Sequence, residues 1–120
     1  MRKILFLFLI IQWTTTFSIS QESDNEVVGR AQDYLKRGET EKAISALKEA
    51  IRLDPKRALF HHQLGLAYHQ KGDPQKAILS LEEAVRLAPE IAKYRKDLAS
   101  AYYSLNRYEE VNRSKSRSLS

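Results

Sequence analysis

The sequence predicts an all-α protein, an α-solenoid of antiparallel helix pairs with about two and a half repeats. The main observation is a self-match: shifted by 34 residues, the segment 42–55 falls on the segment 76–89 with nine of fourteen residues identical. Inside each unit the apolar residues recur at helical spacing. Only four glycines and three prolines occur in the chain, and most of them fall between the expected helices. A period of 34 with helical spacing is typical of stacked helix–turn–helix units.

Local signals place the ends of the helices. Gly38 and Gly72 are 34 residues apart and suit the left-handed conformation that ends a helix. The dipeptide Asp73-Pro74 is a cap followed by a helix start, and Pro55 and Pro89 should stop the second helix of each pair. The expected helices are residues 23–37, 41–53, 57–71, 74–87 and 91–105, with a short stub from 108.

The third unit begins like the others but does not finish. Asn106 stands at the position of Gly38 and Gly72, and Lys115 stands at the position of Leu47 and Leu81. No proline closes this unit. We therefore predict that residues 112–120 form a basic, serine-rich disordered tail.

The N-terminal residues have the order of a secretory signal. Arg2 and Lys3 precede an apolar run, Ile4 to Ile11, and small residues follow at Ser18 and Ser20. Cleavage between Ser20 and Gln21 would divide the chain into a signal peptide (1–20), a helical repeat domain (21–111) and the tail (112–120). The expected location is periplasmic or secreted. An uncleaved anchor and an apolar helix that packs on the domain are the alternatives.

Charge and cysteine content exclude several classes of function. The net charge is +5, but five basic residues lie in the leader and tail, and the remaining 15 match the 15 acidic residues. The folded part is therefore near neutral, which argues against a nucleic-acid partner. Because cysteine is absent, a thiol nucleophile, a zinc–thiolate site and a bacterial lipoprotein anchor are excluded.

The middle unit resembles the tetratricopeptide repeat family, and the likeness extends over residues 24–111. It rests on these residues of the motif: Leu64, Gly65, Tyr68, Gly72, Asp73, Ala77, Leu81, Ala84 and Pro89. The resemblance implies a non-enzymatic scaffold that binds a protein or an extended peptide along its first helices. The groove positions it implies are Val28, Gln32, Leu35, Leu59, His62, Leu66, His69, Lys93, Lys96, Ser100 and Tyr103. Their mixture of apolar and cationic side chains suits a peptide with acidic character.

One specialisation of the family is not expected. Chaperone-binding members hold a terminal carboxylate with lysine, asparagine and arginine side chains, and the corresponding positions here are Val28, Gln32, Gln63, Lys93 and Asp97. Only Lys93 fits that set, and Asp97 would repel a carboxylate.

Histidines are the only residues that invite a chemical role. His62 and His69 are seven residues apart, about 10 Å along a helix, which is too far to bind one metal ion. His61 points in another direction from His62. We expect all three to be surface or groove residues, with no metal, no cofactor, no small-molecule substrate and no catalysis.

The unfinished third unit suggests an open end. Leu98, Ala101 and Leu105 would lack a covering helix, so we predict an interface there with a partner or a second copy. The alternatives to a peptide-binding scaffold are a truncated family member and a structural subunit that self-assembles into a homo-oligomer through this end. A membrane partner is expected only if the leader stays attached.

Overall fold

The computed structural model describes residues 24–119, and all regular structure in this range is helical. A first helix covers residues 24–36, followed by α2 (Thr40–Leu53), α3 (Ala58–Lys71), α4 (Pro74–Leu87) and α5 (Ala92–Leu119). The all-α prediction is confirmed. The predicted leader and its cleavage site lie outside the described residues. Among the helices described, none is long and apolar enough to cross a membrane.

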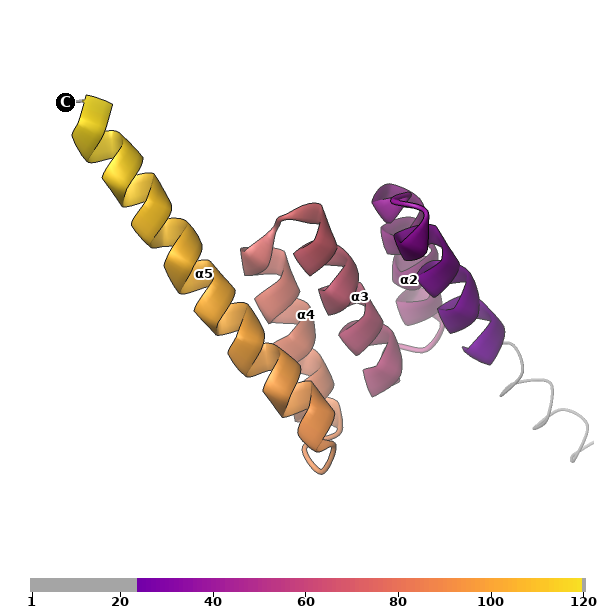
Figure 1. Cartoon of the computed structure of the whole chain (residues 1–120). Helices are drawn as coiled ribbons and strands as arrows, with labels where there is room; N and C mark the ends of the chain where they lie inside the picture. Colours follow the sequence, from indigo (N-terminus) through magenta and orange to yellow (C-terminus); the bar gives the residue numbers. More distant parts are fainter. Residues whose placement is uncertain (1–23, 120) are drawn as a thin grey trace, which may run out of the picture.

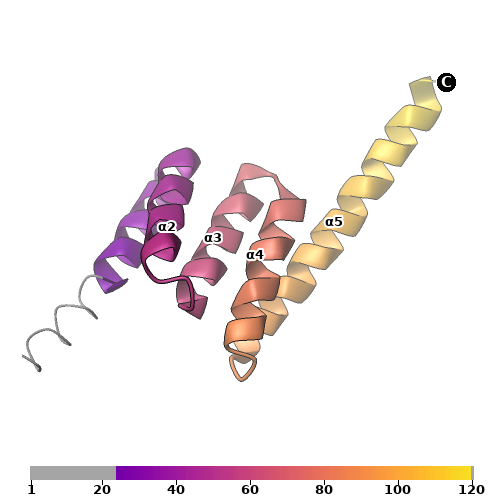
Figure 2. The ribbon, with the colours of Figure 1, turned by 180° about the vertical axis from the view of Figure 1, so that it is seen from behind.

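The helices form two layers. The helix of residues 24–36, α3 and α5 lie at the front in Figure 1. The view from behind brings α2 and α4 forward (Figure 2). Each pair therefore places its first helix in one layer and its second in the other, and the pairs stack side by side.

The turns inside the first two pairs have the same geometry. Gly38 and Gly72 have φ values of 78° and 87°, the left-handed conformation that glycine adopts without steric cost. The amide after each glycine donates to a carbonyl five residues earlier: Glu39 to Tyr34 at 2.8 Å and Asp73 to Tyr68 at 3.0 Å. The Asp73 carboxylate then accepts from the Lys76 amide at 3.2 Å and caps α4, as predicted.

Small residues allow the helices to approach closely. A Cβ added at Gly65 would lie 2.6 Å from Leu81 Cγ and 3.2 Å from the carbonyl oxygen of Ala77. The larger cluster of buried residues spans the first two pairs and comprises Ala31, Ala43, Ile44, Leu47, Leu64, Ala67, Tyr68 and Ala77. A smaller cluster joins α4 to α5. The core therefore consists of contacts between successive helices, and most of its buried residues lie on or against α3.

The C-terminal end differs from the sequence prediction. No break occurs at Asn106, and α5 continues to Leu119, so the expected turn, stub and disordered tail are replaced by one 28-residue helix. A turn at Asn106 would be favourable only if the segment after it packed back on α5. Lys115 stands where the earlier units have a leucine, so that segment would bury too little apolar surface. Without the turn, each further residue keeps its helical hydrogen bond.

The predicted interface of Leu98, Ala101 and Leu105 is also wrong. Ala101 is 2% exposed, and the two leucines are half-buried against Ile78 and Leu81 of α4. These residues face the preceding repeat, which already covers them.

Candidate functional site

The predicted groove residues all come from the first-helix layer, but their exposure differs. Gln32, His69, Lys93, Lys96, Ser100 and Tyr103 are exposed, while Val28, Leu35, Leu59 and Leu66 are half-buried. His62 is buried, with 2% of its surface exposed. His62 must therefore be removed from the residues that a ligand could contact.

His62 forms a polar contact between α3 and α5. Its Nε2 lies 2.6 Å from Asp97 Oδ2, and its ring stacks on Tyr94 with 4.4 Å between centroids and 25° between planes. Burial raises the pKa of the Tyr94 hydroxyl. Asp97, which the sequence suggested only as a repulsive charge, is therefore held by a partner. The sequence signal for this contact was the position of Asp97, which lies one repeat plus one residue after His62.

This pair is not arranged for catalysis. His62 Nδ1 is buried and has no hydrogen-bond partner in the described structure, so neither ring nitrogen is within reach of a substrate. A general base needs such access. No group of three potential metal ligands occurs among residues 24–119 either. The contact positions two helices rather than supporting chemistry.

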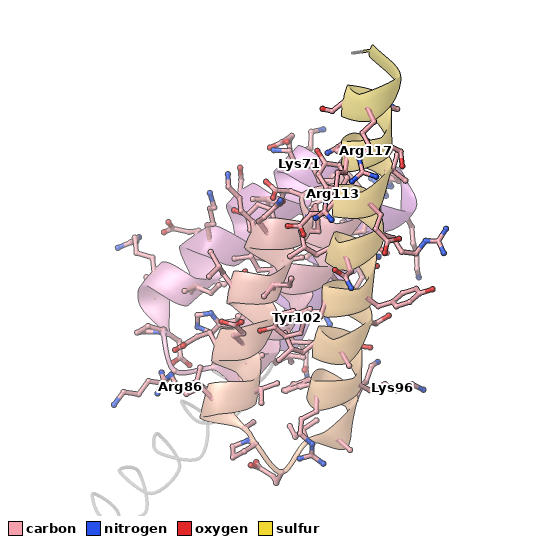
Figure 3. The ribbon with its side chains drawn as sticks, turned by 90° about the vertical axis from the view of Figure 1, so that its left-hand side faces the viewer. Lys71, Arg86, Lys96, Tyr102, Arg113 and Arg117 are labelled. Atoms are coloured by element: carbon pink, nitrogen blue, oxygen red, sulfur yellow. The ribbon has the colours of Figure 1, made fainter. Side chains whose placement is uncertain are left out.

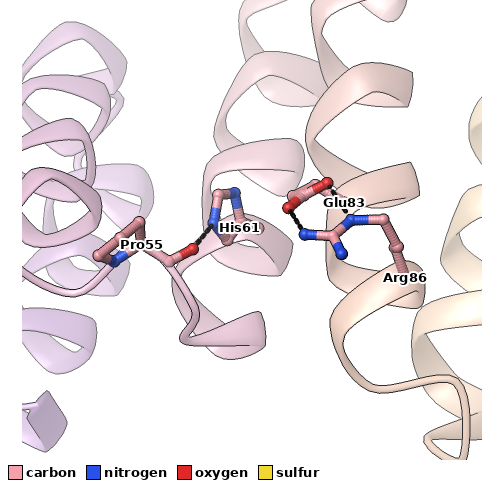
Figure 4. Close-up of polar contacts among 4 residues, drawn as sticks. All are labelled: Pro55, His61, Glu83 and Arg86. Atoms are coloured by element: carbon pink, nitrogen blue, oxygen red, sulfur yellow. Dashed lines mark hydrogen bonds and ion pairs between the residues drawn. The ribbon is translucent and has the colours of Figure 1, made fainter.

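The other two histidines lie at separate places. His61 Nε2 donates to the Pro55 carbonyl at 2.8 Å, near the Arg86–Glu83 pair (Figure 4). The hydrogen bond from Arg86 holds the pKa of Glu83 below its usual range. His69 is exposed near the end of α3. The expectation of surface histidines therefore fits His69. His61 is half-buried, and its hydrogen bond holds the loop between α2 and α3.

The groove positions that stay accessible combine lysines on α5 with apolar side chains on α3. Lys93 and Lys96 are exposed on α5, as are Ser100 and Tyr103, while Leu59 and Leu66 on α3 are half-buried. Figure 3 shows Lys96 pointing away from α4. Gln63, one of the positions for a carboxylate clamp, is buried.

Two family models match the sequence. A TPR repeat model covers residues 31–72, and a tetratricopeptide repeat model covers residues 58–91. Together they span about half of the chain, from residue 31 to residue 91.

The chain belongs to the tetratricopeptide repeat family.

Several solved structures share this fold. The first TPR of Spaghetti (RPAP3), bound to the HSP90 peptide SRMEEVD, superposes with a TM-score of 0.63 at 22% identity, over 78% of this chain and 74% of that one. MamA from residue 41 to its end, from Desulfovibrio magneticus RS-1, gives a TM-score of 0.54 at 28% identity, over 73% and 55% of the two chains. A MamA RS-1 double mutant is similar, at 27% identity. The chain spans little more than half the length of these MamA chains. No curated protein matches it at a significant level.

Proposed function

We propose that this tetratricopeptide repeat protein is an interaction scaffold that binds an extended acidic segment of a partner protein along its first-helix layer. Family and fold support the role of scaffold. The observation that supports an acidic ligand is that Lys93 and Lys96 are exposed on α5, in the same helix layer as the half-buried Leu59 and Leu66 of α3. Lysines at the edge of such a surface favour acidic partners.

The related structure with a bound peptide sharpens this proposal. Its peptide, SRMEEVD, carries three acidic side chains. In the present chain Gln63 is buried and Asp97 bonds His62, so these positions offer no cation for a terminal carboxylate. We expect recognition of acidic side chains within a segment rather than of a C-terminus.

Fluorescence anisotropy with labelled SRMEEVD tests the proposal. We expect its free-acid and C-terminal amide forms to bind equally, and a form with glutamine and asparagine in place of the acids to bind more weakly. The double variant Lys93→Glu, Lys96→Glu should bind roughly ten-fold more weakly, about 1.4 kcal/mol. Lys48→Glu with Lys56→Glu is the matched control, since both residues are exposed elsewhere. Equal binding by groove and control variants, or no binding of the acidic peptide, would contradict the proposal.

We also propose that the protein is exported by the secretory route. The support is the order of Arg2 and Lys3, the apolar run and Ser20 in the sequence. The intact mass of the exported product should correspond to a chain that starts at Gln21. A membrane-bound product that retains Met1 would indicate an anchor instead.

A further inference from the structure

Within residues 24–119, no helix covers the outer face of α5 at the positions that are covered one repeat earlier. In α3, Gly65 packs against Leu81, and Tyr68 is 6% exposed. The equivalent residues 34 positions later are Ala99 and Tyr102. Ala99 is exposed, and Tyr102 is 48% exposed. The described chain offers no helix for this place, because α5 runs straight on to Leu119.

The uncovered residues form one continuous stripe. Their spacing alternates between four and three residues, which keeps them on one side of a helix; the members are Arg95, Ala99, Tyr102, Asn106 and Glu109, with Lys96, Tyr103 and Glu110 beside them. All eight are exposed. The stripe runs about 22 Å along the axis at 1.5 Å per residue. Figure 3 looks onto this end, with Tyr102 toward α4 and Lys96 at the opposite edge of α5.

Charge along the stripe is self-complementary. Arg95 and Lys96 lie on one side of the tyrosine pair 102–103, and Glu109 and Glu110 lie at the same distance on the other side. If two copies of α5 pack antiparallel about a two-fold axis at this tyrosine pair, the cations of each copy face the anions of the other. Parallel copies in the same register would place like charges together.

We propose that the outer face of α5 docks on the same face of a second copy of this chain, antiparallel, with the two-fold axis at Tyr102–Tyr103. The second α5 then occupies the place that α4 occupies against α3. Tyr102 donates a hydrogen bond to Glu82 of α4, which fixes the centre of the stripe. Arg95 of each copy then faces Glu110 of the other copy, so the dimer contains this ion pair twice. A small, polar interface of this kind gives a transient dimer.

Sedimentation velocity at increasing concentration, on protein recovered from cells that express the full chain, measures this association. Arg95→Glu and Glu110→Arg should each weaken the dimer by about ten-fold or more, because each places like charges opposite one another twice. An equimolar mixture of the two variants should dimerise again, because each mixed pair restores both attractions. The control Lys48→Glu, a charge reversal at an exposed residue of α2 outside the stripe, should dimerise like the wild type.

Complementation between the two variants is the decisive result, since general charge effects or association through other segments would not produce it. Circular dichroism spectra that match the wild type exclude unfolding as the cause of lost association. A wild type that stays monomeric at the highest concentration reached would overturn the proposal. So would dimers that respond equally to Lys48→Glu and Arg95→Glu, or variants that fail to dimerise when mixed.

Discussion

A buried imidazole needs partners for both ring nitrogens, and His62 has one. Asp97 accepts from Nε2 at 2.6 Å while Nδ1 has no hydrogen-bond partner in the described structure. A buried polar atom without a partner costs about 1–3 kcal/mol. Removing Asp97 would therefore leave both nitrogens of His62 without a partner and lower the stability of the protein. The stacked Tyr94 ring gives an apolar replacement something to pack on.

A double-mutant cycle at this pair tests that reasoning. Asp97→Ala should lower the free energy of unfolding by about 1–3 kcal/mol, because Nε2 then stays buried without an acceptor. His62→Phe combined with Asp97→Ala should recover much of the loss, since no imidazole nitrogen remains buried. The measurement is the urea midpoint at constant slope. A double variant less stable than either single variant would contradict this view of the site.

At the scale of helices, α3 and α4 meet through the gap at Gly65. Gly65→Leu should destabilise the protein by roughly 1–3 kcal/mol or more through overpacking against Leu81, and Leu81→Ala by roughly 2–5 kcal/mol through the cavity it leaves. Gly29→Ala is the control, because nothing lies within 4 Å of its added Cβ, and it should be neutral or slightly stabilising. Thermal melts compare the three. Equal melting temperatures for Gly29→Ala and Gly65→Leu would contradict the repeat register.

The far half of α5 should contribute helix but little stability. Its residues from Asn106 to Arg117 are all exposed, so Asn112→Pro should lower the helical circular dichroism signal through lost hydrogen bonds and leave the melting temperature nearly unchanged. The matched change Ala101→Pro, at a buried position, should abolish most of the cooperative transition. An irregular tail would instead show no loss of helical signal in Asn112→Pro.

In the whole molecule each helix packs mainly on its neighbours in the array, and α3, in the middle, has neighbours on both sides. Repeat arrays gain stability from neighbours and fray at their ends. Amide exchange should therefore be slowest in α3 and fastest beyond Asn106 in α5. Leu81→Ala should speed exchange more in α5 than in residues 24–36, because Leu81 packs with Ala101. Equal acceleration at both ends would mean that the array unfolds as one unit.

The 34-residue period was enough to predict the first four helices to within a residue or two, because Gly38, Gly72 and Asp73 signal their own backbone conformations locally. It did not predict the end of α5. Asn106 can form either a turn or a helix, and the choice depends on whether Lys115 has something to pack on. His62 was misplaced for a similar reason, since its burial is decided by Tyr94 and Asp97 of the next repeat. The end of α5 and the burial of His62 depend on contacts between repeats, so the residue pattern within one repeat does not predict them.

The bond between His62 and Asp97 also bears on the curvature of the array. A hydrogen bond of 2.6 Å loses most of its strength once its atoms are beyond about 3.5 Å, so the joint between α3 and α5 is either closed or released. The joint between residues 24–36 and α3 also contains a hydrogen bond, from Gln70 Nε2 to the Leu35 carbonyl at 2.8 Å, beside buried apolar residues such as Ala31 and Leu64. Each joint between neighbouring first helices therefore contains a directional polar contact that opposes small shifts. A ligand that fits a flatter surface would have to lengthen both of these hydrogen bonds.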